Sequence, residues 1–313
     1  MFDRKQFGRS PGETGPSAGF SLLEMLVSMV ILLGVTGIVM SGMLQASKAA
    51  GTIENRTEMH ASVRSATELM QQEIGQAGRI GLPGSVTLGS AVSPGSASPT
   101  VGATAASQMF VGEFLVVDTG SNQETVTVTS VGANSFTSNF NNTHAATAPV
   151  TVLGAFGTGV LPDTMTNGSD PSHLKLYGDI NGDGNMVFVE YVCDTSGGNL
   201  YRSVTTLGSA LITAKQVLLP NIQPNPANAA CFTYQEKPTG CSGSSCFVVD
   251  VAVTLTVQTQ QEDATTHAYQ KETKALLNVS PRNVYDAYQL STNSNNRVQP
   301  IPSFVTSLMS QTP

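Results

Sequence analysis

The chain has 313 residues, a formal net charge of -7, 40% apolar residues and 12% charged residues. That length allows one sizeable hydrophobic core with a small appendage, and it excludes a short peptide held together by disulfides. The acidic balance, without a local basic patch, argues against specific nucleic-acid binding. The Thr-, Ser-, Gly-, Val- and Asn-rich middle is typical of a displayed β-rich domain rather than a cytosolic enzyme.

The first predicted element is an apolar helix. Residues 25–44 contain no charged side chain, and about 20 helical residues at 1.5 Å each match the roughly 30 Å hydrocarbon core of a bilayer. The polar and slightly basic residues 1–18 predict an N-terminus in the cytoplasm. A secretory signal would have its small-residue cleavage site after the apolar stretch, whereas the small residue here, Gly19, precedes it.

The motif GFSLLE at residues 19–24, followed by this helix, resembles the class III signal of type IV prepilins and of the pseudopilins of type II secretion. The resemblance implies a leader of residues 1–19, cleavage by a prepilin peptidase between Gly19 and Phe20, and N-methylation of Phe20. It also implies single-pass storage in the inner membrane. Assembly with other major and minor pilins would follow on an inner-membrane platform, and the final location would be an extracellular filament or the periplasm.

Glu24 is the acid at the edge of the apolar run. A lone carboxylate in a membrane costs roughly 2.5–3.5 kcal/mol, so such a residue usually has a partner. By the resemblance, Glu24 is the fifth residue of the mature chain and docks onto the methylated amine of Phe20 in an adjacent subunit, which sets the axial register. The alternative is a helix-end acid that reaches the headgroups and does nothing more.

An amphipathic pattern continues the helix, so we predict one helix over residues 20–82, membrane-spanning over 20–44. Glycines and Pro83 close it. Many major pilins have a kinking proline in the apolar half, whereas only Gly34, Gly37 and Gly42 could loosen this one. Residues 68–81 resemble the helix end in PilW-like minor pilins and in the J-type minor pseudopilin. The predicted inner face is Met59, Val63, Ala66, Met70, Ile74 and Ala77, with Glu54, Arg56, Glu58, Arg64, Glu68 and Glu73 on other faces.

Two segments are predicted between this helix and the main sheet. Residues 83–108, rich in Gly, Ser, Ala, Pro and Thr, read as a linker. Residues 109–154 alternate with period two and predict a small inserted β module. The module resembles one that recurs in bacterial surface and phage-like proteins. We interpret it as decoration, with an adhesive or spacer role as the alternative.

Residues 155–281 predict a pilin-like antiparallel β domain, which makes the fold class α+β. Because the strands lie close in sequence, an antiparallel meander is the economical topology. Residues 282–313 show little periodicity and predict a tail that drapes over the domain or frays. The predicted strands are 173–177, 186–193, 199–204, 230–235, 247–259 and 267–279, the last two forming a hairpin around residues 260–266.

The segment DINGDGNMVFVE, residues 179–190, has the spacing of an EF-hand calcium loop. Its flanks read as strands rather than helices, and Glu190 lies on one of them. The alternative, which we favour, is a hairpin turn whose Asp and Asn side chains bind their own backbone. The candidate Ca²⁺ ligands are Asp179, Asn181, Asp183, Asn185 and Glu190.

The four cysteines, Cys193, Cys231, Cys241 and Cys246, follow the apolar helix and are expected to form two disulfides outside the membrane. The sequence does not choose among the three pairings. Zinc binding by Cys241 and Cys246 is disfavoured because no second cysteine pair or histidine lies at a ligand-like spacing.

The sequence gives little support for catalysis: the histidines are scattered, Ser169 and Asp170 near His173 suggest a turn, and P-loop, HExxH and GxSxG motifs are missing. We therefore expect the substrate of an enzyme rather than an enzyme. By the resemblance, it is a minor pilin of a type IV pilus that primes assembly and serves adhesion, motility or DNA uptake. The alternatives are a minor pseudopilin of a type II secretion system and a membrane-anchored adhesin or calcium-binding module that never polymerises.

Overall fold

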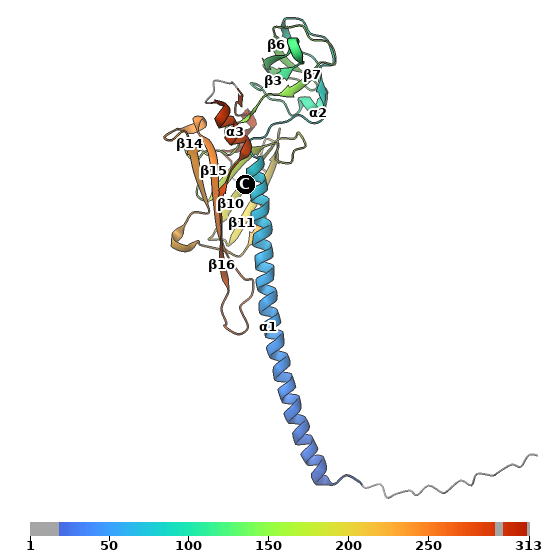
Figure 1. Cartoon of the computed structure of the whole chain (residues 1–313), viewed down its shortest axis with the longest axis vertical. Coiled ribbons are helices and arrows are strands. Elements are labelled where there is room, and N and C mark those ends of the chain that lie inside the picture. Colours follow the sequence, from blue (N-terminus) through green and yellow to red (C-terminus); the bar gives the residue numbers. More distant parts are fainter. Residues whose placement is uncertain (1–18, 292–296, 312–313) are drawn as a thin grey trace, which may run out of the picture. The chain divides into compact units, whose positions relative to one another are not determined.

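The computed structural model describes residues 19–291 and 297–311 (Figure 1). The described residues divide into two units, with the boundary between Glu54 and Asn55. It is an α+β protein with a long apolar N-terminal helix and antiparallel sheets, as the sequence predicts. The predicted leader, residues 1–19, lies outside the described residues except for Gly19.

Helix α1 spans Leu22–Gln76 and so ends six residues before the predicted limit of residue 82. The reason is Gly78, which has a φ of 79° and donates its N–H to the carbonyl of Tyr177 over 2.9 Å. A left-handed φ cannot continue an α-helix. A side chain at this position would come within 2.7 Å of the Phe156 carbonyl oxygen, so only glycine fits there.

The main β domain contains two antiparallel sheets rather than one. In the first, β9 (His173–Gly178), β10 (Val187–Asp194), β11 (Asn199–Thr206) and β12 (Gln216–Pro220) form a meander. In the second, β15 (Phe247–Gln258) pairs with β13 (Ile222–Gln223), β14 (Phe232–Lys237) and β16 (Lys271–Val279). The predicted meander is therefore correct within the first sheet, and the sequence reading missed β12 and β13.

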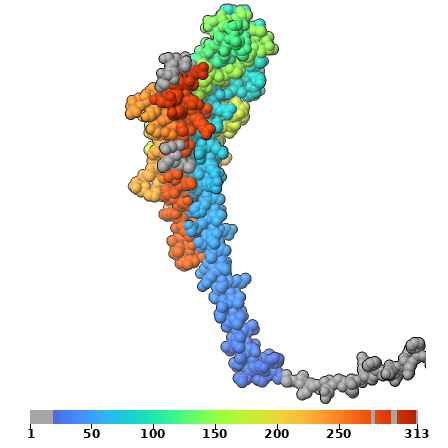
Figure 2. All heavy atoms as spheres, in the orientation of Figure 1, coloured from blue at the N-terminus to red at the C-terminus, as the bar shows by residue number. Residues whose placement is uncertain are grey.

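The second half of α1 packs on these sheets. Its buried side chains share one core with apolar residues of both sheets, among them Leu174, Val189 and Val251. Each buried large apolar side chain contributes about 1.5–3 kcal/mol relative to its exposed state. Figure 2 shows this part of α1 beside β16, where His60 Nδ1 lies 2.6 Å from Glu272 Oε2. The residues of α1 buried in this core are Met59, Val63, Ala66, Met70 and Ile74.

The β module occupies residues 86–152, so the predicted linker 83–108 is wrong. That segment supplies β1 (Val86–Thr87), β2 (Gly95–Ala97) and α2 (Ala103–Ala106). Several of its apolar residues are buried, among them Leu88, which donates its N–H to Ala148 O, and Val92, which bridges to His144. The other module elements are β3 (Phe114–Val117), η1 (Gly120–Asn122), β4 (Glu124–Thr127), β5 (Ser130–Val131), β6 (Phe136–Phe140) and β7 (Pro149–Val152). They form the sheets β1-β7-β3-β4 and β2-β6-β5 around a separate core.

The C-terminal segment has regular structure, contrary to the predicted loose tail. It forms α3 (Arg282–Ser291), β17 (Val298–Gln299) and α4 (Ser303–Leu308), and β17 pairs in parallel with β8 (Ala155–Phe156). Val284, Ala287, Val305 and Leu308 are buried, which explains why these short helices are ordered. The remaining short elements are the 3₁₀ turns η2 (Pro226–Asn228) and η3 (Gly243–Ser245).

Candidate functional site

The predicted processing and docking residues lie at the start of α1. Gly19 and Phe20 precede the helix and are exposed. Ser21 caps the helix, because its hydroxyl oxygen accepts the N–H of Glu24 over 3.2 Å. Glu24 thus occupies the third helical position, where an acid also interacts favourably with the helix dipole. Among the described residues, Glu24 has no ion-pair partner.

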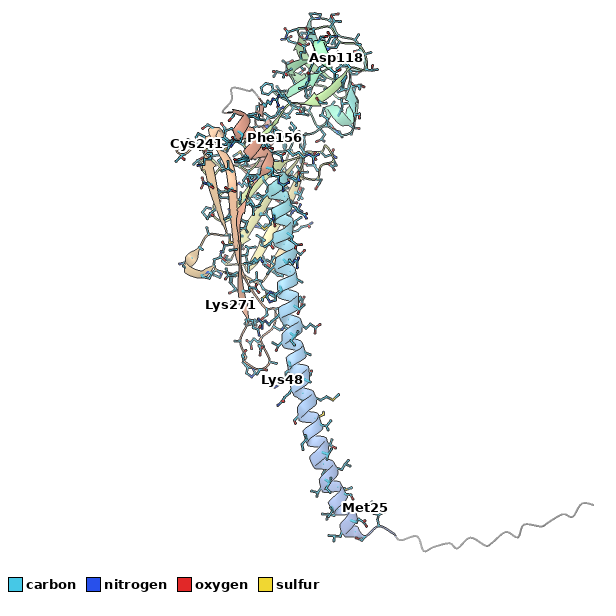
Figure 3. The ribbon with its side chains drawn as sticks, in the orientation of Figure 1. Met25, Lys48, Asp118, Phe156, Cys241 and Lys271 are labelled. Atoms are coloured by element: carbon cyan, nitrogen blue, oxygen red, sulfur yellow. A yellow bond between two sulfur atoms is a disulfide. The ribbon has the colours of Figure 1, made fainter. Side chains whose placement is uncertain are left out.

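Large apolar side chains surround the first half of α1. Every residue from Phe20 to Leu44 is exposed, and Figure 3 shows side chains between Met25 and Lys48 on both sides of the helix. The best 18-residue window has a mean hydropathy of 2.4, and none of it is buried. An apolar surface of this extent marks contact with a membrane or with other proteins. The segment is long and apolar enough to span a bilayer.

The second half of α1 is fixed to the first sheet by a buried acid. Glu73 accepts hydrogen bonds from the Tyr191 hydroxyl and from both Nη2 and Nε of Arg202, the Nε bond measuring 3.2 Å. The sequence reading placed Glu73 on an outer face. Glu73 continues the buried series Met59, Val63, Ala66 and Met70 at spacings of three and four. An acid in an apolar repeat was therefore a signal from which a buried polar contact could have been predicted.

The candidate calcium residues do not converge. Asp179 Oδ1 accepts the N–H of Asp183, Asp183 Oδ1 accepts the N–H of Asn185, and Asp179 Oδ2 lies 3.5 Å from Arg79 Nε. Asn181 is exposed on the same loop. These are turn interactions of Asp side chains with their own backbone.

Glu190 lies elsewhere on the sheet. Val187 pairs with Gly178 beside the loop, whereas Glu190 pairs with Lys175, three residues and about 10 Å further along β10. Its Oε1 is 3.8 Å from Lys175 Nζ, and burial raises the pKa of its carboxyl. The loop therefore lacks the ligand at position 12 of the EF-hand pattern, because Glu190 lies in strand β10, away from the loop.

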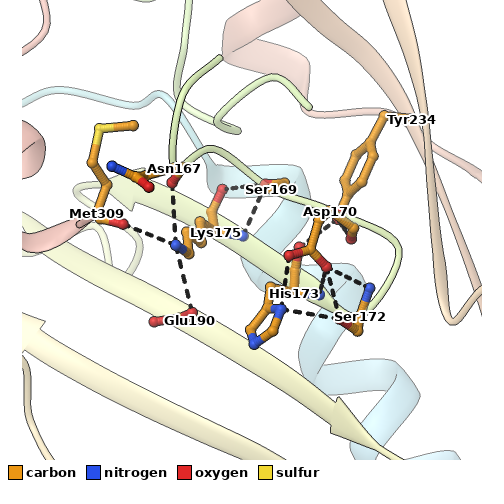
Figure 4. A network of polar contacts seen from close by, with 9 residues as sticks. All are labelled: Asn167, Ser169, Asp170, Ser172, His173, Lys175, Glu190, Tyr234 and Met309. Atoms are coloured by element: carbon orange, nitrogen blue, oxygen red, sulfur yellow. Dashed lines mark hydrogen bonds and ion pairs between the residues drawn. The ribbon is translucent and has the colours of Figure 1, made fainter. Parts of the chain in front are cut away.

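Lys175 holds the C-terminal segment. This almost fully buried lysine donates to the carbonyls of Asn167 over 3.1 Å and Met309 over 2.9 Å, as Figure 4 shows. Together with Glu190, these contacts satisfy a charge that would otherwise be costly to bury. The sequence offered no signal for this clamp, since the Met309 carbonyl lies 134 residues away.

Asp170 and His173 form a turn. Asp170 Oδ1 accepts the N–H groups of Ser172 and His173 over 2.7 and 2.8 Å, and its Oδ2 lies 2.8 Å from His173 Nδ1. Tyr234 donates its hydroxyl to the carbonyls of Asp170 and His173 (Figure 4). The acid serves backbone groups in a strand-entry turn, as the sequence suggested.

The β module has a buried ionic cluster that the sequence reading missed. His144 Nδ1 lies 3.1 Å from Asp118 Oδ2, and its Nε2 lies 2.7 Å from Glu124 Oε1. Burial alone would lower the pKa of His144, but the hydrogen bonds to Glu124 and Asp118 outweigh it and raise that pKa. The cluster joins β3, β4 and the loop before β7, so it is a structural crosslink.

The cysteines form two disulfides, as expected. Cys193 of β10 is bonded to Cys231, and Cys241 is bonded to Cys246. The first bond joins the two sheets of the main domain, and the second closes a short loop before β15. Both stabilise the fold chiefly by restricting the unfolded chain.

Comparison with known proteins found no matching family model, no matching curated protein and no matching solved structure.

Proposed function

We propose that this chain is a minor pilin of a type IV pilus, of the PilW-like kind. It is anchored in the inner membrane by residues 20–44, processed after Gly19, and built into or at the tip of the filament, where it primes assembly. It is the substrate of a prepilin peptidase rather than an enzyme. The β module and main β domain then present surface for adhesion.

The observation that carries the proposal is the position of Glu24, a carboxylate without a partner at the start of an apolar helix. The motif GFSLLE leads into a helix that is apolar on every side, and its acid has no partner among the described residues. A carboxylate of this kind favours pairing with a cation supplied by another chain. The new amine of Phe20 in a neighbouring subunit fits that requirement.

The second half of the helix supports the same proposal. It packs on antiparallel strands through Met70 and the Glu73 network, which leaves a folded domain carrying an apolar segment. Two disulfides suit a domain outside the cytoplasm.

The proposal is tested by Glu24→Ala in cells that make pili. Loss of the pairing should leave cleavage and membrane insertion intact while lowering recovery in sheared filaments at least tenfold, since about 1.4 kcal/mol of lost docking energy already gives tenfold. Glu54→Ala, which removes an exposed acid from the same helix beyond the apolar segment, is the matched control and should assemble normally.

The outcome also separates the alternatives. Undiminished recovery of Glu24→Ala in filaments would remove the docking role. Wild-type protein that stays in the membrane and never enters filaments would favour the anchored adhesin. Neighbouring genes for a secretin and secretion-specific components, rather than a pilus retraction ATPase, would favour the pseudopilin.

A further inference from the structure

The first sheet has a second buried face, opposite to the one that packs on α1. Neighbouring residues in a strand point to opposite faces, and Tyr191 contacts Glu73 of α1, so Glu190 points to the other side. Lys175 of β9 and Ser203 of β11 pair directly with Glu190. Direct cross-strand partners point to the same face. The three polar side chains therefore form one row across the middle of the sheet.

This row is buried, and two of its polar atoms lack partners. Lys175, Glu190 and Ser203 are 8%, 1% and 2% exposed. Glu190 Oε2 and Ser203 Oγ are both buried and have no hydrogen-bond partner among the described residues. A buried polar atom without a partner is costly. Because the two atoms belong to directly paired residues, one bridging group can serve both.

Lys175 has one donor left for such a group. An ammonium has three N–H groups, and two of them bind the carbonyls of Asn167 over 3.1 Å and Met309 over 2.9 Å. The ion-pair partner Glu190 Oε1 lies at 3.8 Å (Figure 4), beyond the hydrogen-bond limit of about 3.2 Å. A polar contact of this length is one that a water molecule can bridge.

We propose that Glu190 Oε2, Ser203 Oγ and Lys175 Nζ bind one internal water molecule, and that this water completes the anchor of the C-terminal segment. The water accepts the third N–H of Lys175, donates one proton to Glu190 Oε2, and shares a hydrogen bond with the Ser203 hydroxyl. If Glu190 is protonated, its O–H donates to the water instead. Three polar partners are typical of a buried water molecule.

The surroundings limit the ligand to the size of water. Two residues further along β9 and β10, Tyr177 and Phe188 share a buried apolar cluster with Val305 and Leu308 of α4. The polar row lies beside this cluster, where Lys175 binds the carbonyl that follows α4. The water would therefore sit beneath the C-terminal segment, in a site that does not depend on the proposed role in assembly.

The direct test needs no variant. A crystal structure of the full-length protein in detergent, at a resolution that shows ordered water, should contain one water molecule at about 2.6–3.2 Å from each of the three atoms. A direct hydrogen bond between Ser203 Oγ and Glu190 Oε2, with no water between them, would overturn the proposal.

Two substitutions at Ser203 test the site in solution. Ser203→Ala leaves room for the water, which keeps two partners, whereas the methyl groups of Ser203→Val occupy its place and leave Glu190 and Lys175 without it. We expect urea titration to give a folding equilibrium constant at least tenfold lower for Ser203→Val than for Ser203→Ala. A dry cavity would give the opposite order, because Val fills it and favours strands. Val217→Ala, at an exposed position of β12, measures that strand preference as the control.

Amide hydrogen exchange of the same variants tests the anchor. Exchange in α4 should be at least tenfold faster in Ser203→Val than in Ser203→Ala, while exchange in α3, which is the control for global unfolding, should change less. The proposal is overturned if Ser203→Val is as stable as Ser203→Ala or more stable, or if exchange in α4 rises no more than exchange in α3.

Discussion

The two halves of α1 use the same apolar residue types in opposite ways. From Phe20 to Leu44 apolar side chains face every direction and all are exposed, whereas beyond Asn55 most of them lie in one buried stripe. A stripe is what a helix needs to pack on a sheet of its own chain. An apolar surface all round packs on nothing in its own unit, and surfaces of this kind are typical of helices in contact with lipid or with other proteins.

The largest effect should come from truncating a buried methionine in the second half of α1. Truncating an exposed methionine in the first half is the matched comparison. Met70 is 0% exposed and Met40 is 59% exposed. Met70→Ala should lower the free energy of unfolding by about 3–4 kcal/mol, and Met40→Ala should change it by less than about 0.5 kcal/mol.

All seven tyrosines lie beyond residue 54, so the tyrosine band of the near-UV circular dichroism spectrum, followed during urea titration of the full-length protein in detergent, reports on that unit alone. Equal destabilisation by Met70→Ala and Met40→Ala would erase the distinction between the halves.

The second half of α1 also has a buried and an exposed acid, Glu73 and Glu68, whose removal should change the free energy of unfolding by different amounts. Glu73→Ala should cost about 3 kcal/mol, less than the upper range for a buried pair because Arg202 is partly exposed. Glu68→Ala on the same helix removes an exposed pair with Arg64 and should cost under about 0.5 kcal/mol. The same urea titration measures both variants, and a loss below 1 kcal/mol for Glu73→Ala would mean that the network does not fix α1 to the sheet.

A smaller effect is expected for pH. The stability of the second unit, which begins at Asn55, should depend on pH through Glu113. This fully buried acid accepts the N–H of Phe110, its other oxygen has no partner among the described residues, and burial raises its pKa from 4.5 to about 8. The unfolded chain therefore loses this proton first, so stability is full below pH 4.5 and falls as the pH rises toward 8.

Glu113→Gln should remove that dependence and raise stability at pH 7 by roughly 2–3 kcal/mol. Melting curves between pH 5 and 8, with the exposed Glu262→Gln as control, check it. His144 acts in the same direction, because its raised pKa makes its contribution fade as the pH rises through that value. A residual slope in Glu113→Gln would come from His144, Glu190 and Glu236, whose pKa values are also raised, whereas a slope equal to that of the wild type would contradict the assignment to Glu113.

The sequence predicted the elements that have strong periodicity and missed those held by distant contacts. Residues 173–177 and 247–259 alternate or run apolar, and both form strands close to those limits. Leu88 and Val92 stand among Ser, Gly and Pro, and their contacts with Ala148 and His144, together with the pairing of β1 with β7 and of β2 with β6, order the segment. The helix α3 had a detectable signal, Val284 and Ala287 three residues apart, which the polar surroundings obscured.

The candidate site divides in the same way. Gly19, Phe20 and Glu24 follow one another closely in the sequence, so a local pattern suffices to predict a role for them. The pairing of Cys193 with Cys231 and the Glu73 network depend on how the helix and the sheets meet. No short-range pattern encodes such contacts.

The central claim is that the apolar segment begins a processed subunit. Mass spectrometry of the protein purified from native membranes tests it most directly, with Gly19→Leu as the blocked variant. Gly34→Leu is the matched control, since a side chain meets no neighbouring atom at either position. We predict that the wild type and Gly34→Leu begin at N-methylated Phe20 and that Gly19→Leu retains its leader. A wild-type chain that begins elsewhere, or Gly19→Leu processed normally, would contradict the account.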